Sequence, residues 1–244
     1  MNSNLNVFLL IGQSNMAGRG RLDDVPSLQH AEVSMFRDGR WIPAEEPLHT
    51  DKPGIAGIGL GMSFAVQLAT RAAIAPIGLI PCAFGGTSLA EWMPCTELYE
   101  NAVSLALAAM LNGGQLRGIL WHQGESDSGN RDDAGSYGRR FQAMIQKLRT
   151  ELSAETVPVI TGELGPFLQK DDGTEFSAVV NQELRGLEDA VPVYGCVGAH
   201  DLGHNGDELH FDAASLREFG IRYATTYIEL TRQPDGGRAD DREG

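Results

Sequence analysis

The chain has 244 residues, of which 42% are hydrophobic and 21% are charged, and this composition is typical of a soluble globular protein. Its formal net charge of −14 disfavours nucleic acid as a partner, because binding to phosphates needs an excess of basic residues. We expect one α/β domain over residues 1–232, followed by a polar, disordered tail over 233–244.

Neither the cysteines nor the termini indicate a cofactor or an anchor. Cys82, Cys95 and Cys196 are too widely spaced for a disulfide framework or a zinc site, so we expect no metal and no cofactor. The N-terminus lacks the basic region of a signal peptide, and no apolar stretch is long enough to span a membrane. We therefore expect a cytoplasmic protein without a membrane partner. The sequence carries no signature of oligomeric state.

Short apolar runs alternate with amphipathic segments along the chain. The predicted strands are residues 7–11, 32–36, 75–83, 116–121, 157–162 and 191–197. The predicted helices are residues 60–73, 96–111, 132–152, 174–190 and 213–230, the last with Asp212 as its N-cap. Residues 41–58, rich in proline, glycine and charge, are expected to form a long loop. Strands that alternate with helices predict a parallel sheet with helices on both faces.

The polar residues of the chain gather in loops that follow the predicted strands. They include Ser14, residues 85–88, residues 122–127 and residues 201–210. Because the carboxyl ends of parallel strands meet at one edge of a sheet, we expect these loops to form one site.

Residues 12–18, Gly-Gln-Ser-Asn-Met-Ala-Gly, form the turn after the first strand and permit three interpretations. The turn could hold a phosphate on its backbone N–H groups, but the lysine and spacing of a P-loop are missing. Ser14 could be a nucleophile, although Met16 stands where the Gly-x-Ser-x-Gly elbow has its second glycine. Ser14 could also simply cap a helix.

A serine nucleophile needs a histidine base that is oriented by a carboxylate. Asp207 and His210 offer such a pair as Asp-x-x-His, in the chain order Ser, Asp, His. Asp201 and His204 form a second Asp-x-x-His in the same loop. Either histidine could instead be a loop or metal-site residue, since the spacing alone is a weak signal.

An acyl-transfer site also needs hydrogen-bond donors where negative charge develops. The backbone N–H groups of Ser14 and of the Gly85-Gly86 pair, and the side-chain amide of Gln123, are the candidates. Gly85-Gly86 could instead be an ordinary turn, and Gln123 an ordinary polar residue. Glu125 could orient His210 or hold the loop through backbone N–H groups.

Gln13 and Trp92 are the candidate substrate-binding residues, because they lie in or beside the loops of this predicted edge. Trp92 would offer an aromatic surface to a sugar ring, with Trp41 as a second candidate. Simple packing of either tryptophan is at least as consistent with the sequence, because tryptophan is usually buried.

Taken together, these segments are similar to the SGNH-hydrolase superfamily, and within it to sialate O-acetylesterase-like and acetylxylan esterase-like carbohydrate esterases. The similarity runs from Val7 to about Ala224. The matching segments are residues 12–18, 59–65, 81–88 with Glu91-Trp92, 121–127 and 207–211.

The resemblance implies a three-layer α/β/α sandwich with a mainly parallel, flavodoxin-like sheet, and a serine esterase without a metal. It assigns Ser14 as nucleophile, His210 as base and Asp207 as its acid partner, with Glu125 as a supporting acid. It places the Ser14 N–H, Gly86 and Gln123 in the oxyanion hole. Many SGNH enzymes have asparagine where Gln123 stands.

The functional hypothesis is therefore removal of O-acetyl groups from a carbohydrate, either acetylated xylan fragments or O-acetyl sialic acid. One alternative is a non-catalytic protein that binds acetylated sugars on the same fold. Another is a short-chain lipase or thioesterase. Glycosidase chemistry by two carboxylates is a poorer fit, since it leaves Ser14 and the glycine pair without a role.

Overall fold

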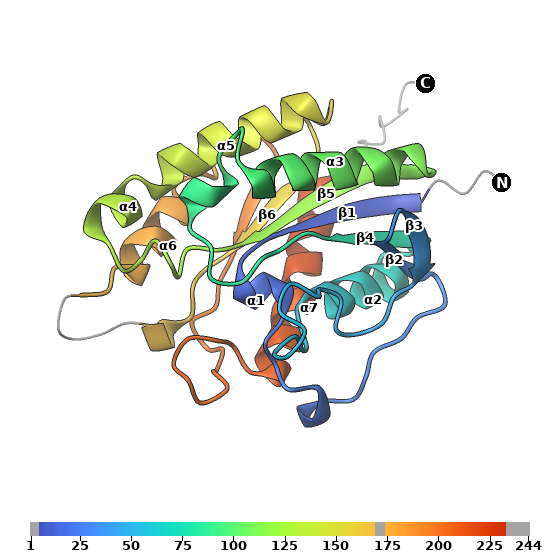
Figure 1. Cartoon of the computed structure of the whole chain (residues 1–244), viewed down its shortest axis with the longest axis horizontal. Helices are drawn as coiled ribbons and strands as arrows, with labels where there is room; N and C mark the ends of the chain where they lie inside the picture. Colours follow the sequence, from blue (N-terminus) through green and yellow to red (C-terminus); the bar gives the residue numbers. More distant parts are fainter. Residues whose placement is uncertain (1–4, 169–173, 233–244) are drawn as a thin grey trace, which may run out of the picture.

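The computed structural model describes residues 5–168 and 174–232 (Figure 1). The tail predicted over 233–244 lies outside these residues. Within the described ranges, no helix is both long enough and apolar enough to cross a membrane.

A seven-stranded sheet in the order β3-β2-β4-β1-β5-β6-β7 forms the centre of the molecule. All neighbouring strands are parallel except β2 and β3, which form an antiparallel hairpin at one edge. The strands are β1 (Leu5–Gly12), β2 (Val33–Arg37), β3 (Arg40–Pro43), β4 (Ile77–Pro81), β5 (Gly114–His122), β6 (Val159–Gly162) and β7 (Tyr194–Val197). The mainly parallel sheet predicted from the sequence is confirmed.

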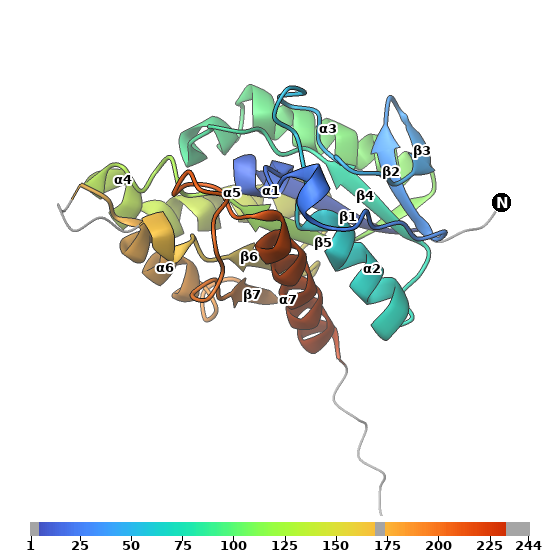
Figure 2. The same ribbon diagram turned by 90° about the horizontal axis from the view of Figure 1, so that it is seen from below.

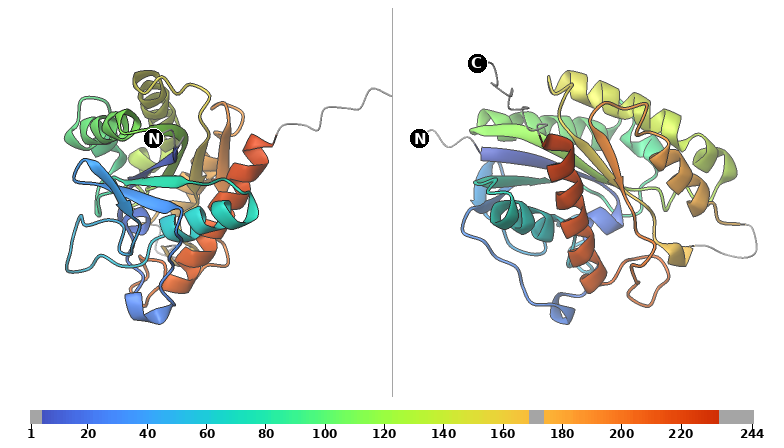
Figure 3. Two further views of the ribbon diagram at one scale, coloured as in Figure 1. Left: turned by 90° about the vertical axis from the view of Figure 1, so that its right-hand side faces the viewer. Right: turned by 180° about the vertical axis from the view of Figure 1, so that it is seen from behind.

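Helices cover both faces of the sheet, as Figures 1, 2 and 3 show. One face packs against α2 (Gly61–Arg71) and α7 (Ala213–Thr231), and the opposite face packs against α3 (Glu97–Leu111), α5 (Tyr137–Glu151) and α6 (Ser177–Arg185). Successive side chains of β1 point to opposite faces, so Phe8 enters the first of these cores and Leu9 the second. The predicted three-layer α/β/α sandwich is therefore the observed fold.

Two short helices and three short 3₁₀ segments complete the described elements. The helices are α1 (Ser14–Ala17) and α4 (Arg131–Gly135), and the 3₁₀ segments are η1 (Leu22–Asp24), η2 (Leu89–Trp92) and η3 (Pro166–Leu168). Asp212 caps α7 as predicted, because its carboxylate accepts the N–H of Ser215 at 2.7 Å.

Two predicted elements differ from the structure. The predicted loop 41–58 begins inside β3, which pairs with β2 as a hairpin. Asp38-Gly39, between the two strands, is a sequence pair typical of hairpin turns. Both residues have positive φ, 50° and 73°, as such a turn requires. The single predicted helix 132–152 is divided at Ser136 into α4 and α5, and Asn130 caps the first of them with its side-chain oxygen.

The predicted helix over 174–190 is shorter in the structure. It spans only α6, and a series of turns follows from Gly186 onward.

Candidate active site

The predicted site lies at the carboxyl edge of the sheet, where loops from its central strands meet (Figure 1). β1 lies between β4 and β5, so the turns after these three strands are adjacent. Gly12 lets the end of β1 lie directly against the end of β5. Its φ is +132°, and an added Cβ would lie 2.1 Å from the carbonyl oxygen of His122. Gln13 then donates its N–H to that same carbonyl at 2.9 Å, which turns the chain into α1.

Ser14 does not cap this short helix. It is the first residue of α1, the N-cap position belongs to Gln13, and no side chain caps the helix. The Ser14 side chain is buried, and its Oγ lies 3.0 Å from Nε2 of His210. The helix-cap interpretation is therefore wrong, and the hydroxyl is bonded instead to an imidazole 196 residues away in the chain.

Asp207 binds the other nitrogen of the same imidazole. Its Oδ2 lies 2.6 Å from His210 Nδ1, and its Oδ1 accepts the N–H groups of Leu209 and His210 at 2.9 and 2.8 Å. Partial burial alone would raise the pKa of Asp207, but these N–H groups and the imidazole outweigh it and hold the pKa below its ordinary value. The carboxylate is thus charged and oriented toward Nδ1 at neutral pH.

The second Asp-x-x-His of this loop is not built in the same way. The Asp201 carboxylate forms an ion pair with Arg222 at 2.7 Å, and His204 Nδ1 accepts the N–H groups of Gly206 and Glu208. Both residues therefore organise the loop and its packing on α7.

The two glycines after β4 differ in their hydrogen bonding. The Gly85 N–H donates to the Asp51 carboxylate at 2.8 Å, whereas the Gly86 N–H has no partner within the described part of the chain. Gly86 is exposed, has a φ of +84°, and lies with Ser14 and His210 on the wall of one cavity. The Ser14 N–H, at the start of α1, likewise has no described acceptor. Both N–H groups are therefore available to a ligand.

A buried ion pair holds the turn at Gly85 in place. Asp51 and Arg19 meet at 2.6 Å, with side chains only 2% and 4% exposed. Burial raises the pKa of Asp51, but the bonds from Arg19 and from the Gly85 N–H lower it further, so that the net pKa lies below its ordinary value. A charged Asp51 thus ties the loop between β3 and α2 to the turn after β4.

His49, in the same loop, is buried as a neutral imidazole. Burial lowers its pKa from 6.5 to about 4, although the Asp51 carboxylate and the carbonyls of Leu10 and Ala17 favour the charged form. A lowered pKa means that the unfolded chain binds this proton more readily than the folded chain.

We expect the free energy of unfolding to fall as the pH is lowered from about 6.5 to about 4, by up to about 3 kcal/mol from His49 alone. His49→Gln removes the titrating group and should flatten this part of the profile. Urea denaturation of both proteins across the range measures the difference. Parallel profiles would show that His49 is not the group responsible.

Gln123 is not placed as an oxyanion donor. Its side chain is fully buried, its Nε2 donates to the Asp127 carboxylate and to the Thr87 carbonyl, and the Gln13 side-chain amide lies beside it at 3.0 Å. These partners already take the amide hydrogens in the described structure, and the oxyanion role of Gln123 stays a prediction. Gln123 instead joins the turns that follow β1, β4 and β5.

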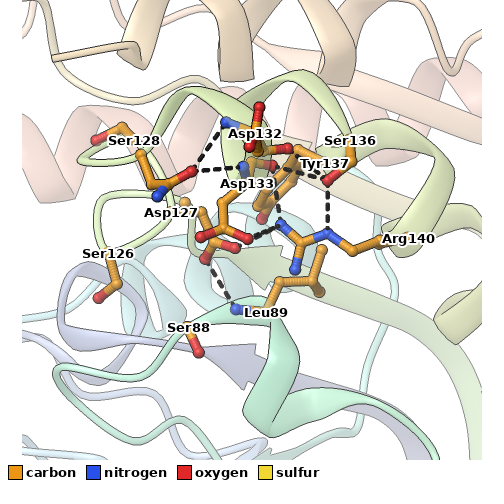
Figure 4. A network of polar contacts seen from close by, with 12 residues as sticks. Ser88, Leu89, Ser126, Asp127, Ser128, Asp132, Asp133, Ser136, Tyr137 and Arg140 are labelled. Atoms are coloured by element: carbon orange, nitrogen blue, oxygen red, sulfur yellow. Dashed lines mark hydrogen bonds and ion pairs between the residues drawn. The ribbon is translucent and has the colours of Figure 1, made fainter.

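Asp127 is the centre of a polar network that holds these turns (Figure 4). One of its oxygens accepts from the Leu89 N–H at 2.8 Å as well as from Gln123, and the other accepts from Arg140 at 2.8 Å. Both oxygens of the buried carboxylate thus have donors. The network positions the turn after β4 relative to β5.

Glu125 does not contact His210 in the described structure. Its buried carboxylate accepts a hydrogen bond from Asn15 and lies 3.3 Å from Nε2 of His122. Burial raises the pKa of Glu125, but His122 and Asn15 lower it more, so that the net pKa is below its ordinary value. Asp207 occupies the Nδ1 position of His210 in the described structure, and the role of Glu125 as a supporting acid stays a prediction.

A cavity of about 390 Å³ opens above Ser14 and His210. Gln13, the predicted substrate-binding residue, lies on its wall together with Arg19, Lys52, Ile55, Gly85, Gly86, Glu125, Ser126 and Leu209. Ile55 is 59% and Leu209 is 38% exposed, so the rim of the cavity is partly apolar.

Trp92 does not reach this cavity. It is only 1% exposed, its Nε1 donates to Thr87 at 3.0 Å, and its ring packs edge-on against Trp121. Trp41 lies on β3 and packs against Phe36. The predicted aromatic surface is not found at Trp92, whose indole packs within the protein, and Trp41 is half-buried at the edge of the sheet and outside the wall of this cavity. Phe84 is the aromatic residue that is exposed beside Gly85, at 41%.

Comparison with known proteins gives a consistent result. A family described as carbohydrate esterase, sialic acid-specific acetylesterase, matches residues 4–229. A probable carbohydrate esterase of Arabidopsis thaliana is 34% identical over 241 residues, which cover 91% of this chain and 90% of the relative. The X-ray structure of that plant protein has a TM-score of 0.85 at 31% identity, over 93% of this chain and 99% of that chain.

A carbohydrate acetylesterase from Xanthomonas citri shares the fold. Its TM-score is 0.67 at 22% identity, and the match covers 92% of this chain and 56% of that chain. The predicted three-layer α/β/α fold is thus shared with a carbohydrate acetylesterase of known structure.

Proposed function

This chain belongs to the carbohydrate esterase family of sialic acid-specific acetylesterases, and from that premise we propose that it is a serine esterase with Ser14, His210 and Asp207 as its catalytic triad. As a member of this family it is a carboxylic ester hydrolase. The observation that carries the triad is the continuous line of contacts from the Ser14 hydroxyl through His210 to Asp207.

The proposed reaction begins when Ser14 Oγ attacks the acetyl carbonyl carbon and His210 Nε2 accepts the hydroxyl proton. Asp207 holds the imidazole with its proton on Nδ1, so that Nε2 is free to act as the base. The N–H groups of Ser14 and Gly86 stabilise the oxyanion of the tetrahedral intermediate. His210 then protonates the departing sugar oxygen, and water, activated by the same imidazole, hydrolyses the acetyl-enzyme.

The proposed substrate is an O-acetylated carbohydrate, either O-acetyl sialic acid or an acetylated xylo-oligosaccharide. We propose that residues 1–232 form one esterase domain around this site, with Gln13 on the substrate-binding wall. Ile55 and Leu209 offer an apolar part of the cavity wall beside Ser14, where the methyl group of an acetyl ester could lie.

Acetate release from a panel of acetylated sugars, measured beside hydrolysis of acetyl, butanoyl and octanoyl esters of one alcohol, tests this proposal. We expect release from at least one sugar and activity that falls with acyl length. Rates that rise with acyl length would indicate a lipase or thioesterase. Sugar binding without any release would indicate a non-catalytic binding protein.

The proposed oxyanion hole predicts a selective effect of Gly86→Ala. Alanine at a φ of +84° is strained by about 1 kcal/mol, and the backbone moves to relieve it. A displaced N–H should lower kcat by about 10- to 100-fold, less than the 10²–10³-fold typical for outright loss of a donor.

Gly113→Ala is the matched control. Gly113 has a φ of +90°, an added Cβ meets nothing within 4 Å, and it precedes β5 at the edge of the sheet opposite Ser14. Steady-state kinetics and thermal melts of both variants should give similar losses of Tm but a loss of kcat only for Gly86→Ala. Equal kcat values in the two variants would remove Gly86 from the oxyanion hole.

A further inference from the structure

Asn15, which follows the proposed nucleophile, contacts the peptide groups on both sides of His210. Its Oδ1 accepts the N–H of Phe211 at 3.0 Å, and its Nδ2 donates to the carbonyl of Leu209 at 3.2 Å. The Asn15 side chain is buried, with the residue only 1% exposed. These two bonds connect the turn after β1 directly to the backbone that carries the imidazole.

The segment that precedes His210 has few contacts with the body of the protein. Asp207 and Glu208 are exposed, Gly206 and Glu208 have positive φ, and the hydrogen bonds of Asp207 are made to the segment itself. On the other side of His210, Phe211 is fully buried and packs against His122, Phe167 and Phe219. The bonds to Asn15 act on the two peptide groups between these parts and, together with Phe211, set where the backbone at His210 lies relative to Ser14. A displacement of about 1 Å in such a site can cost 10²-fold in rate.

Glu125 determines which way the Asn15 amide faces. Its Oε1 accepts from Asn15 Nδ2, so the amide nitrogen points toward Leu209 and the oxygen toward Phe211. The buried carboxylate is charged at neutral pH and lies beside His122 on the β5 side. Glu125 thus reaches His210 only through Asn15, which accounts for a buried acid in the cavity wall that contacts neither Ser14 nor His210.

We propose that Asn15, oriented by Glu125, is a positioning residue that holds His210 at the hydroxyl of Ser14. The inference rests on the proposed roles of Ser14 and His210 and adds two residues that act through the imidazole. Neither Asn15 nor Glu125 exchanges a proton with the substrate.

The first test is Asn15→Ala, measured as kcat and KM for acetate release. Loss of both backbone contacts should lower kcat by about 10- to 100-fold and leave KM nearly unchanged, because the cavity wall that binds the substrate is intact. A kcat within twofold of the wild-type value, in a folded protein, would overturn the proposal.

Asn181→Ala is the matched control. Asn181, on α6, bonds the backbone of one loop residue in the same two-sided way: its Oδ1 accepts the Leu164 N–H at 2.7 Å and its Nδ2 donates to the Leu164 carbonyl at 3.1 Å. Asn181→Ala should lower Tm to a similar extent and leave kcat unchanged. Equal losses of kcat in both variants would mean that Asn15 has only a general structural role.

A pair of substitutions tests the contribution of Glu125 without truncating either side chain. Asn15→Asp removes the amide donor and places a second carboxylate against Glu125, so kcat should fall by about 10- to 100-fold. Adding Glu125→Gln restores a hydrogen-bond donor between the two positions. The kcat of the double variant should therefore be about tenfold higher than that of Asn15→Asp alone. A double variant no more active than Asn15→Asp would overturn the role of Glu125.

Failure of this inference differs from failure of the proposed function. Ser14→Ala without acetate release, together with an Asn15→Ala protein of wild-type kcat, rejects only the positioning role. Acetate release that persists in Ser14→Ala rejects the proposed triad itself.

Discussion

Replacing Ser14 by alanine is expected to lower kcat for acetate release by roughly 10⁴- to 10⁶-fold, the loss typical of a serine hydrolase without its nucleophile. Ser14 Oγ is the group bonded to His210 Nε2. Without this oxygen, the imidazole has no hydroxyl to deprotonate and the enzyme has no nucleophile to take the acetyl group. The backbone N–H groups at position 14 and at Gly86 remain in this variant and would still polarise the ester carbonyl. A small residual rate above that of uncatalysed hydrolysis is therefore expected. Acetate release from the best sugar of the panel measures the effect.

Ser63→Ala serves as the control for loss of a buried serine hydroxyl. Ser63 lies on α2, and its Oγ donates to the Leu60 carbonyl at 3.1 Å, away from the cavity. This variant should lose some stability and retain its kcat. If Ser14→Ala instead kept a rate within tenfold of the wild type, Ser14 would not be the nucleophile.

The second large effect is expected for Asp207→Asn, with a fall in kcat of about 10³- to 10⁴-fold. The asparagine oxygen can still accept the N–H groups of Leu209 and His210, so the turn is preserved. At the position of Oδ2, however, an amide would donate to Nδ1 and leave the ring proton on Nε2, where Ser14 needs a base. The change therefore alters the tautomer of His210 more than the structure.

Glu125→Gln is the informative comparison for Asp207→Asn. It removes the same charge from the other candidate acid but keeps an oxygen that can accept from Asn15, so its effect should be about tenfold or less. Kinetics of the two variants side by side distinguish the two acids. A larger loss in Glu125→Gln than in Asp207→Asn would make Glu125 the effective partner of the base.

The sequence was sufficient to predict the layers, the parallel strands and the position of Ser14, because these follow from local patterns. A buried parallel strand is a short apolar run, and its carboxyl end is where a polar turn interrupts the run. Asp207 and His210 were predictable for the same reason, since three residues of spacing within one turn already bring a carboxylate to an imidazole.

The predictions that the structure does not support concern side chains whose environment depends on distant segments. Trp92 follows polar loop residues in the sequence, but its indole is covered by Trp121 from β5. The sequence leaves the side-chain amide of Gln123 available as a donor, yet Thr87 and Asp127 accept its hydrogens in the folded protein. No spacing within one segment indicates such competition for hydrogen-bond donors.

Asp51 and Asn15 were without a predicted role for a related reason. Asp51 lies in a loop whose charged residues look solvated, and only its burial against Arg19 and the Gly85 N–H reveals its function in the fold. Asn15 stands beside Ser14 in the motif, but both of its backbone partners are about 195 residues away. The polar character of a turn was visible in the sequence, whereas the partners of each side chain were not.

The most direct test of the account is to find where the acetyl group goes. Wild-type protein is mixed with excess p-nitrophenyl acetate, quenched in acid during the first turnover, digested and examined by peptide mass spectrometry. We predict one acetyl group on the Ser14 hydroxyl, which disappears as the substrate is exhausted and is absent from Ser14→Ala. Turnover without any acetylated peptide, or with an acetyl group on another residue that exchanges at the rate of turnover, would contradict the serine esterase mechanism.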